Sequence, residues 1–304
     1  MDMFEAVFLT VITASTPLLI AAIGELVCER SGVLNLGVEG MMVMGAVCGF
    51  AATVMTGSAP VGVLAGIAGG VFMAMLFAVM VLTFAANQVA SGLALTIMGL
   101  GLSGLIGTSF VGQQIGAVPK LHIPGLSDIP LVGSVLFGQD AFVYASFALV
   151  ALVWWFLNRT RAGLVLRAVG DSHVSAHALG HPVLKVRFLA IVFGGACSGL
   201  AGAYLSMAYT PFWVQGMTAG RGWIALALVV FSSWLPGRVV IGAYLFGAVS
   251  ILQLYAQGTG LGIPSQLMSA LPYLATILVL VLISGVRSRT GAPATLGIPF
   301  VPDR

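Results

Sequence analysis

Apolar runs of about twenty residues recur along this 304-residue chain. A helix rises 1.5 Å per residue, so a run of that length can cross the ~30 Å hydrocarbon core of a bilayer. The mean hydropathy of +1.09 and the charged fraction of 7% leave too little polar surface for a water-soluble protein of this size. The runs are also too long for barrel strands. The chain is therefore predicted to be an all-α polytopic membrane protein.

Glycine, proline and charge clusters divide the chain into about nine predicted spans, within a range of eight to ten. The predicted spans cover residues 5–23, 37–56, 62–83, 92–111, 140–157, 188–210, 222–236, 239–256 and 268–285. Residues 1–304 are expected to form a single transmembrane domain that contains a polar loop at 158–187. Glycines at every fourth position, such as Gly62, Gly66 and Gly70, favour close packing of helices within the chain over a dimerisation face.

The distribution of basic side chains predicts the orientation of the chain. They collect in the loop at 158–187, at Arg238 and in the tail at Arg287 and Arg289. If successive helices alternate in direction, these three clusters share one side, which the positive-inside rule makes cytoplasmic. The C-terminus is then cytoplasmic, the N-terminus is external, and the loop at 112–139 is external as well.

The tryptophans lie near the ends of the predicted spans. They are Trp154, Trp155, Trp213, Trp223 and Trp234. Tryptophan is enriched at membrane interfaces, so these side chains are expected to act as interfacial anchors and not as a platform for stacking a base.

The segment LRAVGDSHVSAHALGHPVLKVRF, residues 166–188, is far more polar than its surroundings. Asp171 or Ser172 is suited to cap a short helix that ends near Leu179, because Gly180 favours a helix stop and Pro182 cannot continue the helix. The sequence therefore predicts a short helix inside the polar loop.

Three interpretations apply to His173, His177 and His181, which are spaced by four residues. The first is a metal site, which would need a further ligand beyond the histidines. The second is a solvated loop. The third, which we favour, is a docking helix that presses its apolar side chains into a groove on a soluble partner.

The run RAGLVLRAVGDSHVSAHALGHPVLKVR resembles the cytoplasmic coupling loop of ABC importer permeases, in the branch that serves branched-chain amino acids, simple sugars and nucleosides. ERSGVLNLGVEGMMVMGA, NQVASGLALT, IPGLSDIPLVGSVLFGQ and WIALALVVFSSWLPGRVVIGAYLFG look like the nucleoside-type members. Sugar-type relatives tend to have Asp-Leu-Ser where this chain has Asn35-Leu36-Gly37, so the resemblance favours nucleosides over sugars and branched-chain amino acids.

The resemblance implies a type II ABC importer-like permease with a cytoplasmic coupling helix, in the plasma (inner) membrane of a prokaryote. A cytoplasmic ATPase, which uses ATP and Mg, an extracytoplasmic solute-binding protein and a second permease, identical or paralogous, are the implied partners. The implied ATPase contacts are Arg167, Gly170, Asp171, His173, Ala176, His177 and Gly180. His177 stands where the family usually has an arginine, so this position departs from the family pattern.

The chain itself has no phosphate-binding loop and no recognisable catalytic motif. It is therefore not expected to be an enzyme, to hold a cofactor or to bind nucleic acid. ATP hydrolysis is assigned to a separate subunit.

Polar residues inside the predicted spans mark a candidate substrate pathway, because a carboxylate at the bilayer centre costs roughly 2.5 to 3.5 kcal/mol. Glu39 lies one turn after Asn35 in a glycine-flanked segment that is predicted to unwind. Pairing with Arg30 is the alternative for Glu39, and helix capping is the alternative for the group around Asn87. The candidate pathway residues are Asn35, Glu39, Asn87, Gln88, Ser91 and Gln253.

Two other functions remain open at this point. An ion-coupled secondary transporter would need an acidic site at mid-membrane, for which Glu39 is the strongest candidate. A membrane-bound enzyme would need the histidines of the polar loop to hold a metal.

Overall fold

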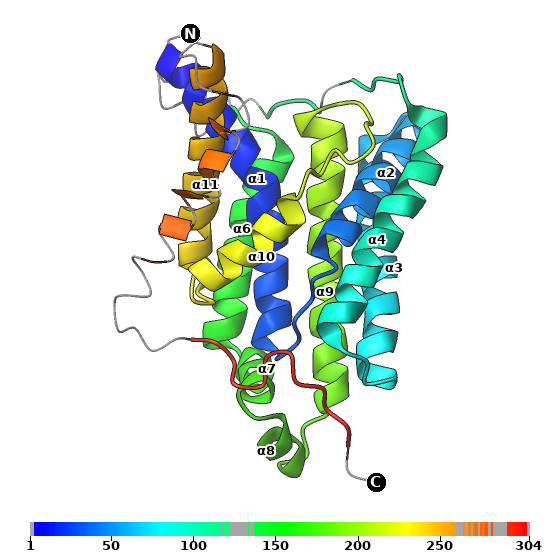
Figure 1. Ribbon diagram of the computed structural model, residues 1–304, viewed down its shortest axis with the longest axis vertical. Helices are drawn as coiled ribbons and strands as arrows, with labels where there is room; N and C mark the ends of the chain where they lie inside the picture. Colours follow the sequence, from blue (N-terminus) through cyan, green and yellow to red (C-terminus); the bar gives the residue numbers. More distant parts are fainter. Residues whose placement is uncertain are drawn as a thin grey trace.

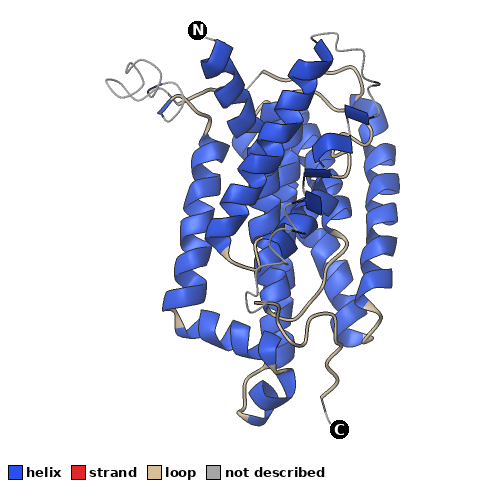
Figure 2. Ribbon diagram, turned by 60° about the vertical axis from the view of Figure 1, so that its left-hand side comes forward, coloured by secondary structure: helices blue, strands red, loops and turns tan. Residues whose placement is uncertain are grey.

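The chain forms a bundle of long helices that run roughly along the long axis of the molecule (Figure 1). The computed structural model describes residues 3–116, 118–121, 137–258 and 291–302, together with residues 133, 264, 267–268, 270–272, 274–275, 277–278 and 281. Figure 2 shows helices joined by loops, and no strand is assigned in the described part of the chain. The all-α prediction is therefore confirmed.

Seven long helices make up the bundle in the described part of the chain. They are α1 (Met3–Arg30), α2 (Val38–Thr56), α3 (Ala59–Ala78), α4 (Gln88–Gly107), α6 (Ala141–Arg159), α9 (Val183–Tyr204) and α11 (Pro236–Gly258). Helices α3 and α9 continue into the π-helical turns η1 (Val79–Thr83) and η3 (Leu205–Tyr209), and α4 continues into the 3-10 turn η2 (Thr108–Phe110). The shorter helices are α7 (Arg161–Asp171), α8 (His173–Ala178) and α10 (Arg221–Phe231).

The predicted count of about nine spans is not confirmed, since seven described helices are long and apolar enough to cross a bilayer. The prediction at 222–236 is wrong as a single spanning helix, because α10 has 11 residues. At 1.5 Å per residue it reaches only about 16 Å, roughly half of the hydrocarbon thickness. Half of the positions in the predicted span at 268–285 lie outside the described residues, and the described half is helical.

Helix α1 is longer than its predicted span, which ended at residue 23. It continues without interruption to Arg30 and so carries Glu25 and Glu29 inside a spanning helix. The predicted break was placed at these charged residues. Both are fully buried, and their carboxylates accept hydrogen bonds from other parts of the chain.

Glycine faces hold α2, α3 and α9 together. A Cβ atom on Gly70 would lie 2.2 Å from the carbonyl oxygen of Gly195, and one on Gly45 would lie 2.4 Å from that of Gly199. Only a hydrogen atom fits at these positions, so the three backbones approach closely and gain van der Waals contact. This confirms the prediction that the spaced glycines pack within the chain.

Helices α7 and α8 project from one end of the bundle, beside the C-terminal residues 291–302, while the N-terminus lies at the opposite end (Figure 1). The turn that follows α10 reaches the same end as α7, because the Arg30 guanidinium donates to the carbonyl oxygens of Trp234 at 2.8 Å and Gly291 at 2.9 Å. The polar loop, the 232–235 turn and the C-terminal segment therefore meet, as the charge pattern predicted. Arg287 and Arg289 lie outside the described residues.

The tryptophans do not form one class. Trp154 and Trp155 are about half exposed near the end of α6, as expected for interfacial anchors, and Trp223 is also exposed. Trp213 and Trp234 are instead buried. The Trp213 ring packs against Gly107, and the Trp234 indole N–H donates a hydrogen bond to Glu29. The anchoring prediction is wrong for these two, because neighbouring helices cover them.

Candidate functional site

The projecting end of the molecule is an elbow made of α7 and α8. Ser172 separates the two helices, and its side-chain oxygen accepts a hydrogen bond from the Ser175 backbone N–H at 3.2 Å. Asp171, the other predicted cap, is the last residue of α7 and is exposed. Gly180 follows α8 with a φ of +83°, a conformation that glycine adopts at little cost. The short helix predicted inside the polar loop is therefore confirmed.

The tip of the elbow presents apolar side chains to solvent. Val174 is 66% exposed and Leu179 is 78% exposed, whereas Ala176 on the inner face is buried in a small cluster with Val169 and Phe300. The elbow thus has one face fastened to the bundle and one apolar face that the described residues leave exposed.

His173 belongs to the inner face of α8. Its Nδ1 lies 3.3 Å from a guanidinium nitrogen of Arg187, and its ring stacks at a tilt on Phe300, with 5.2 Å between the ring centres. Burial, and then the positive charge of Arg187, lower the pKa of His173. The ring of His177 lies edge-on to Phe300, with 5.3 Å between the ring centres.

The histidines do not converge on a common point. His181 lies beyond the end of α8, so the three side chains do not form one row. No group of three His, Cys, Asp or Glu side chains suited to a metal ion occurs in the described part of the chain.

Arg187 is the centre of a buried hydrogen-bond network. From the sequence it was recognised only as one of the basic residues of the polar loop. Its guanidinium, on α9, donates to the carbonyl oxygens of Ser31 at 3.2 Å and Ile298 at 3.0 Å, and to the Thr295 hydroxyl at 3.3 Å. One buried side chain thereby joins α9 to the end of α1 and to the C-terminal segment.

Residues 291–302 form what we call the C-terminal strap. Its Thr295 donates to the carbonyl oxygen of Gly170 through the backbone N–H at 3.0 Å and through the hydroxyl at 2.6 Å. The Gly297 N–H donates to the Gly32 carbonyl at 3.1 Å. The strap therefore fastens the end of α7 to the turn that follows α1.

Gly170 is the tightest point of this junction. A Cβ atom there would lie 2.2 Å from the carbonyl oxygen of Arg30 and 3.2 Å from the backbone nitrogen of Gly32. Arg167, one turn earlier, is half-buried, and its Nε has no hydrogen-bond partner among the described residues. Of the predicted coupling residues, Gly170, His173 and Ala176 therefore face the bundle, whereas Asp171, His177 and Gly180 are exposed.

The glycine-flanked segment between α1 and α2 is non-helical over residues 31–37, as predicted, but the prediction is wrong for Glu39, which lies in the first turn of α2. It rises from the lower end of α1 to the start of α2 (Figure 1). Asn35 in this segment is fully buried, and its backbone N–H and side-chain amide donate to the two carboxylate oxygens of Glu25 at 3.2 and 3.5 Å. Gln88 accepts a hydrogen bond from the Leu34 N–H at 2.8 Å, which fixes the segment to α4.

Glu39 is held at the start of α10. Its carboxylate accepts hydrogen bonds from the Thr218 hydroxyl at 2.6 Å and from the backbone N–H groups of Gly220 at 2.8 Å and Gly222 at 2.6 Å. A helix N-terminus stabilises a negative charge, because its first N–H groups are free to donate. Arg30, the alternative partner, is bonded to the carbonyls of Trp234 and Gly291 instead.

Glu25 and Glu29 were missed because the predicted first span stopped before them. Glu29 accepts a hydrogen bond from the indole N–H of Trp234 at 2.5 Å, while its second oxygen has no partner among the described residues. The i, i+4 spacing of the two acids within an otherwise apolar helix was the signal available in the sequence.

The remaining pathway candidates take different positions. Asn87 is exposed and caps α4, accepting from the Ala90 N–H at 3.0 Å, and Ser91 is buried one turn later. Gln253 of α11 lines a cavity of about 180 Å³ that Tyr209 and Arg221 also line. Among the described residues, the six candidates therefore occupy several separate places in the bundle.

The model of a protein family described as "branched-chain amino acid transport system / permease component" matches residues 7–283, which is nearly the whole chain. The chain belongs to this family.

Relatives of the chain are also permeases of ABC transporters. A putative glucose ABC transporter permease of Haloferax volcanii is 43% identical over 291 residues, which are 88% of each chain. A guanosine ABC transporter permease of Bacillus subtilis is 32% identical and covers 94% of this chain and 93% of its own. A nucleoside ABC transporter permease of Lactococcus lactis is 31% identical over 95% of both chains. The family resemblance is thus confirmed, and the chain is an ABC transporter permease.

Proposed function

We propose that this permease is the transmembrane subunit of an ATP-driven importer for nucleosides, and that the α7–α8 elbow receives the force of a cytoplasmic ATPase. The observation that carries the proposal is the construction of the elbow. Its apolar tip is left exposed by the described part of the chain, and its base is fastened to the bundle at Gly170 and Arg187.

The elbow is suited to transmit motion because its base is rigid. A push on Val174 and Leu179 moves α8, and the two Thr295 bonds to Gly170 carry that motion to the strap and to the turn after α1. From there the unwound segment leads to α2, whose first turn is bonded through Glu39 to α10. A displacement at the tip can thereby reach the middle of the bundle through backbone that is hydrogen-bonded to its neighbours.

The partners follow from this role. ATP and Mg are used by the separate ATPase, a solute-binding protein delivers substrate to the opposite face, and a second permease, identical or paralogous, completes the pore. The elbow and the C-terminus then face the cytoplasm of a prokaryotic cell, which agrees with the basic side chains of this end.

The substrate assignment rests on Asn35-Leu36-Gly37 and on the guanosine and nucleoside permeases among the relatives. Import of a simple sugar is the second candidate, which the 43% identity to a putative glucose permease favours. Both substrate classes carry a polyhydroxylated ring.

ATP-dependent uptake into vesicles tests the proposal. The permease is purified with its ATPase and partner permease, reconstituted, and supplied with binding protein and labelled guanosine, uridine or glucose. We expect ATP-dependent uptake of the nucleosides and its loss in Leu179→Asp, with Leu164→Asp, an exposed α7 position, as the matched control. Uptake of glucose alone would contradict the substrate, and uptake independent of ATP would contradict the class of transporter.

A further inference from the structure

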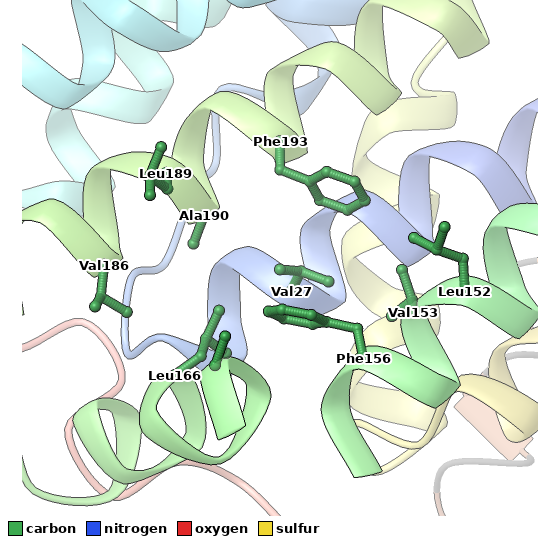
Figure 3. A pocket seen from close by; sticks show the side chains of 10 residues that line it. Val27, Leu152, Val153, Phe156, Leu166, Val186, Leu189, Ala190 and Phe193 are labelled. Atoms are coloured by element: carbon green, nitrogen blue, oxygen red, sulfur yellow. The ribbon is translucent and has the colours of Figure 1, made fainter. Parts of the chain in front are cut away.

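An apolar pocket lies between the elbow and the bundle, where four helices meet. It has a volume of about 350 Å³, and α1, α6, α7 and α9 all contribute to its wall. Figure 3 shows the side chains converging on it, and all of them are apolar. The lining residues are Val27, Leu152, Val153, Phe156, Ala162, Leu166, Val186, Leu189, Ala190 and Phe193.

The pocket is closed toward the protein and open toward the membrane. On the inner side Val27, Val153 and Ala190 are at most 4% exposed. On the outer side Leu152 and Leu189 are 55% and 56% exposed. Both belong to helices that are apolar enough to span a bilayer, so this opening faces hydrocarbon. A polar solute would find no side-chain partner here, whereas an acyl chain would.

The depth of the pocket places it at the edge of the bilayer. The exposed Trp154 and Trp155 lie on α6 beside the lining residues, and tryptophan concentrates at the headgroup level. About one helical turn after these tryptophans, α6 ends at Arg159. An acyl chain in the pocket would therefore have its headgroup near the α6–α7 turn.

That turn carries two exposed cations, Arg159 and Arg161, between the lining residues of α6 and those of α7. Two hydrogen bonds of the Thr160 hydroxyl hold the turn. The hydroxyl donates to the Phe156 carbonyl oxygen at 2.7 Å and accepts from the Gly163 backbone N–H at 3.0 Å. Basic side chains beside a pocket between membrane helices attract anionic lipid headgroups.

We propose that this pocket binds one acyl chain of an anionic phospholipid whose headgroup lies on the Arg159–Arg161 turn. Leu166 of α7 and Val27 of α1 form adjacent parts of the wall, so the bound chain fills the space between the elbow and the bundle. The lipid then supports α7 at the point where it leaves the membrane and makes the position of the elbow dependent on the composition of the bilayer.

Photolabelling with phosphatidylglycerol that carries a diazirine on its acyl chain tests the proposal on the full importer in vesicles. We expect adducts on the peptides that contain Leu152 and Leu189. Ala162→Trp, which places a ring in the pocket, should remove them. Ala148→Trp, at an exposed α6 position outside the lining, should not. Equal labelling of both variants would overturn the acyl-chain site.

The headgroup contact is tested by competition between lipids. Replacing Arg159 and Arg161 by Gln should lower the preference for phosphatidylglycerol over phosphatidylcholine by about fivefold for each arginine. Arg238→Gln, an exposed arginine at the same end of the molecule, serves as the control. A preference unchanged in the double variant would overturn the headgroup assignment. Labelling that is absent in the wild type because a second permease covers this face would overturn the whole proposal.

Discussion

Gly170→Ala adds one carbon atom at the place where α7 touches the end of α1. The new Cβ atom would lie 2.2 Å from the Arg30 carbonyl oxygen, whereas ordinary contacts begin at 3.4 Å. The obstacle is backbone that the helix holds in place, so α7 must move away by about 1 Å. The two hydrogen bonds from Thr295 to the Gly170 carbonyl, at 3.0 and 2.6 Å, lengthen with that movement.

The magnitude follows from three contributions. Overpacking costs about 1 to 3 kcal/mol, and weakening two hydrogen bonds costs up to about 0.5 to 1.5 kcal/mol each. Alanine returns about 1 kcal/mol of helix propensity. A net loss of about 2 kcal/mol lowers the ratio of fastened to released α7 by roughly thirtyfold.

The assay compares ATP hydrolysis with uptake in the same vesicles. We expect Gly170→Ala to hydrolyse ATP with much less uptake, because the ATPase moves an elbow that is no longer fastened to the bundle. Gly237→Ala is the control: this glycine lies near the same end, and a Cβ atom there meets nothing within 4 Å. Normal uptake per ATP in Gly170→Ala, with an unchanged Tm, would refute the reasoning.

Three further predictions follow from the same contacts. Arg187→Met should lower the Tm of the purified complex, since three acceptors lose their donor at a cost of about 1 to 3 kcal/mol each; an unchanged Tm would show that the network does not hold the strap. The pKa of His173 is lowered in the folded protein, so the folded state resists protonation of this side chain and stability should fall as the pH drops through 6.5, the ordinary pKa of histidine. His173→Gln should reduce that fall when the Tm is measured against pH. An identical pH profile in the variant would contradict the assignment. Glu39→Gln should destabilise the protein by about 2 kcal/mol, since an amide offers one oxygen to three donors; chemical denaturation in detergent would detect it, and a neutral effect would exclude Glu39 as the link between α2 and α10.

The short helix α8 could be predicted closely because its signals are local. Ser172, Gly180 and Pro182 act through their own backbone and the next few residues, so the cap and the stop needed no knowledge of the fold. The packing of spaced glycines was predictable for a similar reason, since small residues at every fourth position define one face of a helix.

The end of α1 and the role of 222–236 could not be predicted from hydropathy. Glu25 and Glu29 interrupt an apolar run, and only the fold shows that Asn35 and Trp234 satisfy them inside it. Conversely, the apolar run at 222–236 is buried by protein on several sides and ends after 11 helical residues. Hydropathy records that a side chain avoids water, but it does not distinguish lipid from protein as the surroundings.

The sequence by itself determined the membrane class, the positions of most spanning helices and the short helix in the polar loop, because hydrophobicity and capping are properties of neighbouring residues. Only the tertiary structure decided that Arg187 and Thr295 join α7, α9, the end of α1 and the C-terminal strap, across more than a hundred residues of sequence. Hydrogen bonds between such distant residues leave no periodic pattern in the chain, since they depend on where folding brings each donor and acceptor.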